Sequence, residues 1–246
     1  MLAGLLEELA THQIRELATT GGNLLQDKRC SFYRNGFDCY KRGGWTRPCY
    51  ALLGDHRFHH AVIGGHRCQA VTPSDLATGL LALDAVAHSV PPGSKPGRRR
   101  TIDQLYAGPG EPDMAAGELL TMLEGPAAAR ARPAAFEKLK LYAGDFAVCS
   151  AAVSLELEDD GVTIAGARVS LGAVAPKPYR ATRSEKRLIG ASLSDGQALK
   201  EASWAWTAET TPLLGNVWKV QATCGLLLRA LNRAASTAAS ERSGNE

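Results

Sequence analysis

The chain has 246 residues, of which 45% are hydrophobic and 22% are charged, and its net charge is +3. This composition is ordinary for a soluble globular protein, and the length allows one large domain or two modest ones whose core needs no disulfides. The small net charge indicates neither a nucleic-acid partner nor a membrane surface. No stretch is apolar for long enough to span a membrane, and residues 1–9 lack the features of a signal peptide, so the sequence predicts a cytoplasmic protein.

The predicted elements begin with a short amphipathic helix over residues 1–9 and a short strand over residues 13–18. The sequence TTGGN follows, in which Gly21 and Gly22 permit positive φ angles and a close approach of the backbone to a ligand. A glycine pair before apolar residues is also typical of an ordinary tight turn. From the residues alone the tight turn is the more frequent structure, and a ligand-binding turn stays open.

Residues 29–68 form a predicted cysteine-rich loop with little periodicity, many glycines and scattered Arg and His. A loop of about forty residues is unusual in a compact domain unless something else orders it. Its four cysteines are Cys30, Cys39, Cys49 and Cys68, with 8, 9 and 18 residues between them. These gaps do not match the paired CxxC spacing of zinc ribbons. Spacing alone leaves open a [4Fe–4S] cluster on four thiolates, a zinc site shared with nearby histidines, and cysteines that hold no metal.

Regular elements return after the cysteines. Ser74 is a candidate cap for the next helix, and Asp75 lies where the helix dipole favours an acid. A strand is predicted over residues 84–90 and an edge strand over residues 118–123. The basic run at residues 98–100 is expected at the solvated tip of a hairpin. The Ala-rich residues 127–133 then predict a boundary between subdomains.

A second unit is predicted from about residue 134. Asp160 and Gly161 are a strong hairpin signal within it, and Ser194 with Gln197 has the pattern of a capping box. The predicted elements, in chain order, are strands over residues 136–141, 146–157 and 162–171 and helices over residues 182–189, 194–206 and 216–231. Residues 146–154 fit a small-residue helix as well as a strand. The polar residues 235–246 are expected to form a disordered tail.

Several segments together resemble the FAD-binding medium subunit of the xanthine dehydrogenase family of molybdenum hydroxylases. They are IRELATTGGNLLQ, RCSFYR, CYKRGG, HAVIGG, TPSDLATGLLALDA, FEKLKLYAGDFA and VSLGAVAPKPYRA. The spaced cysteines are similar to those of the aldehyde oxidoreductase branch, whose flavin subunit carries an extra [4Fe–4S] cluster. The resemblance implies an α+β fold. A partial FAD-binding subdomain of the PCMH type would cover residues 1–126. A domain like the C-terminal domain of the carbon monoxide dehydrogenase flavoprotein, a three-stranded antiparallel sheet packed on helices, would cover residues 133–234.

The resemblance also implies roles for individual residues. Around the FAD phosphates and ribityl chain it would place Thr19, Thr20, Gly21, Gly22 and Asn23. Asp75 matches an acid that contacts the flavin nucleotide, and Leu120 and Lys138 match positions near its adenine and isoalloxazine ends. The four cluster ligands would be Cys30, Cys39, Cys49 and Cys68. No residue matches a catalytic acid, base or nucleophile.

The implied function is electron transfer. A molybdenum-cofactor large subunit would hydroxylate an aldehyde or heterocycle, and a [2Fe–2S] small subunit would pass electrons through FAD to an external acceptor. The assembly would be a heterotrimer or its dimer, and a partner that bears a signal could export it. No segment of the form AGGT precedes residue 19, so we expect an N-terminally short member with weakened FAD binding and an exposed apolar face. The alternative is a truncated module that binds a cluster or zinc, but no flavin, and serves assembly.

Overall fold

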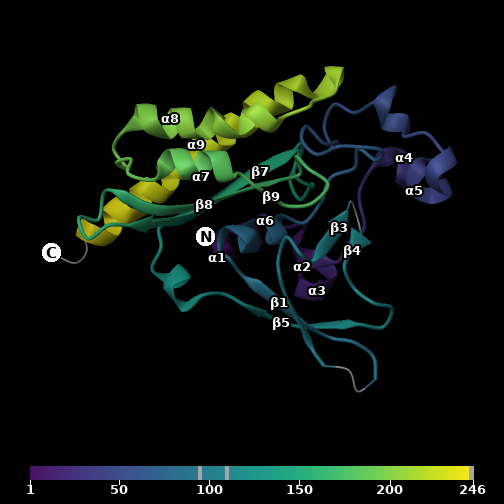
Figure 1. Cartoon of the computed structure of the whole chain (residues 1–246), viewed down its shortest axis with the longest axis horizontal. Coiled ribbons are helices and arrows are strands. Elements are labelled where there is room, and N and C mark those ends of the chain that lie inside the picture. The colour runs from purple at the N-terminus through teal and green to yellow at the C-terminus, as the bar shows by residue number, and fades with distance from the viewer. Residues whose placement is uncertain (94–95, 109–110, 244–246) are drawn as a thin grey trace.

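The structure, a computed structural model, describes residues 1–93, 96–108 and 111–243, with side chains in the last helix described as far as Ser240. The chain forms an N-terminal half of short helices and small sheets and a C-terminal half of one antiparallel sheet covered by three helices (Figure 1). The α+β fold class is therefore confirmed.

The first three elements of the chain are short helices. The elements are α1 (Leu2–Glu7), α2 (His12–Leu17) and α3 (Thr20–Leu24). The strand predicted over residues 13–18 is wrong, because Thr11 caps a helix there by accepting a hydrogen bond from the backbone N–H of Ile14. The cysteine segment contains only single turns, which are α4 (Ser31–Arg34), α5 (Tyr40–Gly43) and two 3₁₀ turns, Gly44–Thr46 and Tyr50–Leu52.

Helix α6 (Asp75–Ala82) begins where the sequence predicts. Its cap is Ser74, whose Oγ accepts a hydrogen bond from the N–H of Ala77 at 3.0 Å. The chain continues as β1 (Val86–Val90), β2 (Arg98–Thr101), β3 (Tyr106–Gly108), β4 (Glu111–Pro112) and β5 (Leu119–Glu124). One sheet has the order β2-β1-β5, so β5 is an edge strand as predicted, and β3 pairs with β4.

The hairpin tip predicted for the arginine run is wrong. These residues form strand β2, and Arg100 is buried, with its Nη2 2.7 Å from a carboxylate oxygen of Glu118 and its Nη1 2.8 Å from Ser89 Oγ. The carboxylate of Glu118 explains why one arginine of the run can be buried, while Arg98 and Arg99 of this edge strand remain partly or fully exposed.

The C-terminal sheet has the order β6-β7-β8-β9. Its strands are β6 (Ala134–Leu139), β7 (Cys149–Leu157), β8 (Ile164–Gly172) and the two-residue β9 (Tyr179–Arg180). The three long strands match the expected three-stranded sheet, and β9 is a short addition. Gly161, at φ 66°, lies in the turn between β7 and β8, as its pairing with Asp160 in the sequence predicts.

Three helices cover one face of this sheet (Figure 1). They are α7 (Thr182–Leu188), α8 (Gly196–Ala205) and α9 (Val217–Ser243), and two 3₁₀ turns, Trp206–Glu209 and Leu214–Asn216, lie between α8 and α9. The cap of α8 is Asp195 and not the predicted Ser194, because the Asp195 carboxylate reaches two backbone N–H groups. Helix α9 continues through the first residues of the predicted disordered tail, since Ala234 and Ala238 still pack into the core; residues 244–246 of that tail lie outside the described residues.

The two larger buried cores do not follow the boundary between the two halves. One core lies between the sheet and α7–α9 and includes Val62 and Ile63 from the cysteine segment. The other surrounds α6 and includes Phe136 and Ala152 from the C-terminal sheet. Each half thus contributes residues to the core of the other half.

Candidate functional site

The TTGGN segment forms the first turns of α3 and not a simple tight turn. Thr19 is its cap, and its Oγ1 accepts a hydrogen bond from the N–H of Gly22 at 3.0 Å. Thr19, Thr20 and Gly22 are exposed. A Cβ built on Gly21 would lie 3.8 Å from Leu120 Cδ2, so the turn and Leu120 of β5, two separate parts of the predicted flavin site, do lie together.

Asn23 joins this turn to the start of α6. Ser74 Oγ donates a hydrogen bond to Asn23 Oδ1 at 2.8 Å while it caps α6. The hydroxyl of Tyr106 donates to the carbonyl of Leu24 at 2.9 Å. The first hydrogen bond holds α3 beside the residue that precedes Asp75, and the second holds α3 beside β3.

Asp75 and Lys138 are bonded to each other. Lys138 Nζ lies 2.8 Å from Asp75 Oδ2, and the two side chains are only 2% and 4% exposed. Ser150 donates to the other carboxylate oxygen at 3.3 Å, and Lys138 also donates to the carbonyl of Glu8 at 3.2 Å. Burial raises the pKa of Asp75, against the attraction of Lys138. The sequence does not indicate this pairing, because the partners are far apart in the chain.

Lys138 also lines an open cavity of about 530 Å³ between α1, β6 and α9. Lys140 lines it too and forms an ion pair with Glu8. Across the cavity, Arg233 and Arg229 of α9 each lie 3.2 Å from the carboxylate of Glu137. The walls therefore carry four basic side chains and three acidic ones, and each basic side chain lies against a carboxylate.

The four predicted metal ligands line one small cavity. Cys30, Cys39, Cys49 and Cys68 surround it together with aromatic side chains, Lys28 and Lys41, and no carboxylate is in its lining. Its volume is about 10 Å³, room for about one water molecule. Among the described residues, no three His, Cys or carboxylate side chains are grouped closely enough to hold a single metal ion.

The thiols lie in a buried, hydrogen-bonded environment. Burial is the main cause that raises the pKa of Cys30 and of Cys68. Backbone hydrogen bonding at Phe32 and Tyr33 lowers the pKa of the Cys30 thiol against this effect of burial, and that at Ala70 does the same for the pKa of Cys68. The ring Nε2 of His60 lies 3.4 Å from Cys30 Sγ. Sequence reasoning did not single out His60 from the other histidines of the segment.

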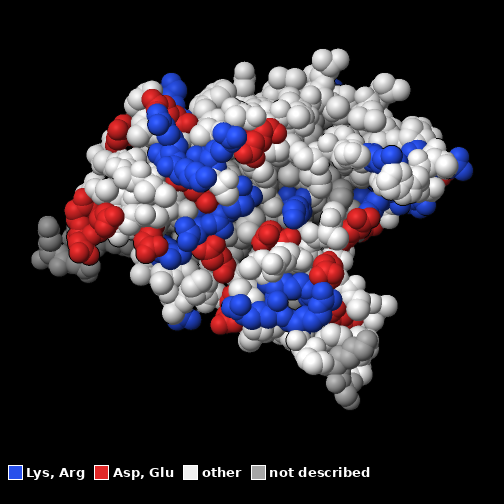
Figure 2. All heavy atoms as spheres, in the orientation of Figure 1, with Lys and Arg blue, Asp and Glu red and all other residues white. Residues whose placement is uncertain are grey.

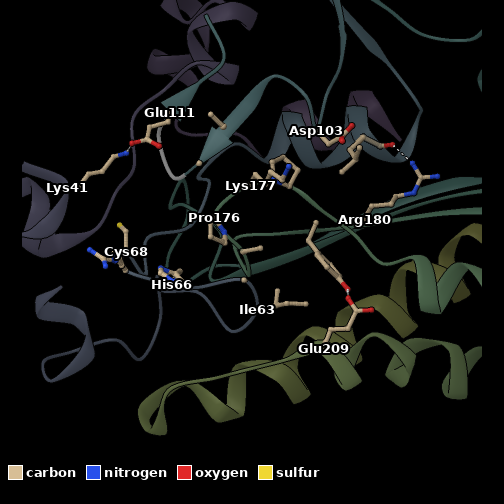
Figure 3. A pocket seen from close by; sticks show the side chains of 18 of the residues that line it. Lys41, Ile63, His66, Cys68, Asp103, Glu111, Pro176, Lys177, Arg180 and Glu209 are labelled. Atoms are coloured by element: carbon tan, nitrogen blue, oxygen red, sulfur yellow. Dashed lines mark hydrogen bonds and ion pairs between the residues drawn. The ribbon is translucent and has the colours of Figure 1, made fainter. Parts of the chain in front are cut away.

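A larger cavity of about 850 Å³ adjoins the cysteines (Figure 3). Cys68, Tyr40 and Lys41 line both cavities. Its walls come from the cysteine segment, the β3–β4 hairpin and residues 175–180, and it contains none of the residues predicted to bind FAD. Over the face shown in Figure 2, basic and acidic side chains alternate in small patches, in keeping with the small net charge. In the described part of the chain, no helix combines the length and the apolar character that a membrane crossing requires.

Comparison with known proteins gives two family matches. Residues 1–128 match the FAD binding domain in molybdopterin dehydrogenase, and residues 134–234 match the CO dehydrogenase flavoprotein C-terminal domain. The chain is 35% identical over 187 residues to the aldehyde oxidoreductase FAD-binding subunit PaoB of Escherichia coli (strain K12), which covers 73% of this chain and 56% of that protein. It is 32% identical over 145 residues to the glyceraldehyde dehydrogenase medium chain of Sulfolobus acidocaldarius, covering 58% of this chain and 50% of that one. The chain spans about half the length of these curated relatives.

Solved structures show the same fold. Carbon monoxide dehydrogenase from Hydrogenophaga pseudoflava matches with a TM-score of 0.69 and 22% identity, over 96% of this chain and 67% of that chain. Quinoline 2-oxidoreductase from Pseudomonas putida 86 matches with a TM-score of 0.67 and 21% identity over the same shares. The expected resemblance to FAD-binding medium subunits is thus confirmed: the chain belongs to the family of FAD binding domains in molybdopterin dehydrogenase and continues into a CO dehydrogenase flavoprotein C-terminal domain.

Proposed function

We propose that the chain is the FAD-binding, [4Fe–4S]-carrying electron-transfer subunit of a molybdenum-containing oxidoreductase of the aldehyde or xanthine dehydrogenase type. It would take electrons from a [2Fe–2S] subunit and pass them to an external acceptor. The observation that carries this proposal is that four cysteines from separate turns line one cavity in a chain whose N-terminal half matches a FAD-binding family. The flavin and the cluster, when bound, would supply the electron-transfer chemistry, and the protein would supply position and electrostatics.

The residues present fit a flavin nucleotide. The exposed start of α3 offers the hydroxyls of Thr19 and Thr20, and the two glycines after them let a ligand approach the backbone closely. Leu120 would provide an apolar contact next to Gly21. Asp75 has its carboxylate oxygens bonded to Lys138 and Ser150, so it would act by holding Lys138 in place at the wall of the cavity between α1, β6 and α9.

The types of residue that line the small cavity suit an iron–sulfur cluster. Four cysteines are the usual ligand set of a [4Fe–4S] cluster, and each binds a different iron atom, which spaces them more widely than a single ion would. Backbone N–H groups directed at ligand sulfurs are typical of the surroundings that tune such clusters. The cavity is narrower than a cluster, so binding one would have to widen it.

Two of the relatives are named as a subunit and a medium chain. We therefore propose a molybdenum-cofactor large subunit and a [2Fe–2S] small subunit as partners. Apolar side chains exposed on α2 and β5 suit contact with another polypeptide, namely Ile14, Leu17, Leu119 and Met122.

The test is anaerobic purification of the chain, alone and co-expressed with its partner subunits, followed by iron, sulfide, zinc and flavin analysis. We expect four iron atoms and four sulfides for each chain, a broad visible absorbance from the cluster, and flavin bands in the complex. Cys39→Ser should abolish the cluster absorbance, whereas Cys149→Ser, a buried cysteine outside the cavity, should leave it unchanged. Zinc without iron would overturn the cluster and favour an interaction module, and a cluster without flavin would favour the assembly module.

A further inference from the structure

Two buried side chains at the start of α9 fasten the cysteine segment to the C-terminal half. Lys219 is fully buried, and its Nζ donates to the carbonyl oxygens of Phe58 at 2.9 Å, His60 at 2.9 Å and Ala173 at 2.6 Å. An ammonium group has three N–H donors, so all three are satisfied by backbone carbonyls. Lysine side chains are almost never fully buried unless they have polar partners. The partners of Lys219 are these three carbonyl groups.

Asn216 repeats this attachment one turn earlier. Its Nδ2 donates to the carbonyls of Ala61 at 3.1 Å and His60 at 3.4 Å. The carbonyl of His60 therefore receives hydrogen bonds from two residues of the C-terminal half. These bonds hold the backbone of His60 in place, and with it the point from which its side chain extends.

The ring of His60 is directed at a predicted cluster ligand. The residue is 3% exposed, its Nε2 lies 3.4 Å from Cys30 Sγ, and its Nδ1 is buried without a hydrogen-bond partner. A neutral imidazole has one donor and one acceptor nitrogen. When Cys30 is a thiolate, its sulfur can only accept, so the donor is Nε2–H. That assignment leaves Nδ1 as the unpaired acceptor.

We propose that His60 is an outer hydrogen-bond donor to the Cys30 thiolate and that Lys219 and Asn216 are positioning residues that hold it there. The inference rests on the proposed function, because it concerns the same cluster site. A donor on a ligand sulfur withdraws electron density and favours the reduced cluster. Below pH 7, where Lys219 is an ammonium group, its buried positive charge acts in the same direction. The C-terminal half thereby sets the reduction potential of a cluster whose ligands all lie in the N-terminal half.

The test is a redox titration of the anaerobically loaded full chain, with the reduced cluster followed by its electron paramagnetic resonance signal. His60→Leu and Lys219→Met should both shift the cluster to a lower potential while the iron content stays that of the wild type. His60→Gln should recover most of the shift, because the glutamine amide can place a donor near the position of Nε2. His59→Leu is the matched control, since the structure shows no hydrogen bond from His59 to a cysteine among the described contacts, and it should leave the potential unchanged.

Unchanged potentials in His60→Leu and Lys219→Met at full iron content would overturn the inference and leave the proposed function standing. A wild-type chain that takes up no iron would instead refute the proposed cluster. If Lys219→Met does not fold, Asn216→Ser makes the same test, because it removes one donor to the His60 carbonyl and leaves Lys219 in place. It must shift the potential in the direction of His60→Leu, and a shift in the opposite direction or none would count against the positioning role.

Discussion

Among single residues, Asp75 and Lys138 were predicted to bind the flavin, but the structure shows that they form a buried ion pair with each other. Asp75→Asn keeps the shape of the side chain and leaves the Lys138 charge buried without its counter-charge. We expect the free energy of unfolding to fall by about 3–5 kcal/mol, since breaking a buried pair is far more costly than removing both charges. Urea denaturation of this variant is compared with Glu201→Gln, which breaks the exposed pair with Arg187 and should change stability little. A loss no larger than that of the control would contradict the buried pair.

Lys219 should give the protein a distinct dependence on pH. Burial lowers its pKa from an ordinary 10.5 to about 7, so between these values the unfolded chain binds more protons than the folded one. Its contribution to stability is complete above pH 10.5 and is lost as the pH falls toward 7. We expect the stability of the wild type relative to Lys219→Met to rise from pH 7 to about 8.5. Burial raises the pKa of the neighbouring Cys149, an effect of opposite sign, but both proteins retain that thiol. A difference that is flat with pH would refute the prediction.

The sequence indicated neither the burial of Lys219 nor its partners. Asn216, Lys219 and Thr223 are polar residues that the structure buries at the start of the last helix, so an apolar pattern does not mark them. The carbonyl partners of Lys219 lie more than a hundred residues away, at Phe58 and His60, and no local pattern encodes such a contact. For the same reason the pairing of Asp75 with Lys138 needed the fold.

Among the elements, helix α6 has a cap, Ser74, that was predicted from the sequence, and the contribution of this cap to stability can be measured. Ser74→Ala removes the cap of α6 and the donor to Asn23 together. We expect a loss of about 1–2 kcal/mol in stability and weaker FAD binding, because α3 loses its attachment to α6. Thermal unfolding and a flavin titration measure the two effects. Ser194→Ala is the control: its pattern predicted a cap, but Asp195 has that role, and the variant should unfold like the wild type.

The elements also show where periodicity fails. Strand β7 is buried on both faces, with Ala151 and Val153 in the core under α9 and Ala152 in the core around α6. A strand covered on both sides does not alternate between apolar and polar residues, which is why residues 146–154 fitted a helix equally well. Strand β2 was missed because a run of arginines indicates a solvated segment, whereas Arg100 is buried and forms an ion pair with Glu118, the residue before β5.

At the scale of the whole molecule, the two cores predict one cooperative unfolding transition. Val62 and Ile63 complete the core under α9, and Phe136 and Ala152 complete the core around α6, so neither half buries its apolar surface alone. Scanning calorimetry should give a single peak whose calorimetric and van't Hoff enthalpies agree. Far-ultraviolet circular dichroism and tryptophan fluorescence should report the same midpoint. Two separate peaks would show that the halves are independent.

The sequence supplied the fold class, the family resemblance and the four cysteines, but it could not supply their arrangement. Separations of 8, 9 and 18 residues are equally compatible with a cluster, zinc or no metal. Only the fold brings the four side chains around one cavity and shows that Cys68 also borders the larger one. Long-range arrangement of this kind depends on packing between elements and not on local spacing.

The shared cores have a consequence for making chimeras of related subunits. The Ala-rich segment near residue 130 looks like a natural splice point, yet an exchange there would separate Val62 from the carbonyl of Val174, to which its N–H donates at 2.8 Å. The hydrogen bonds from Lys219 of α9 to the carbonyls of Phe58 and His60 would also have to form between segments of two different proteins. A recombinant that transplants residues 58–63 together with the C-terminal half keeps the core under α9 intact. In the core around α6 it would still combine Phe136 and Ala152 of one parent with N-terminal residues of the other, so those two positions must be matched as well.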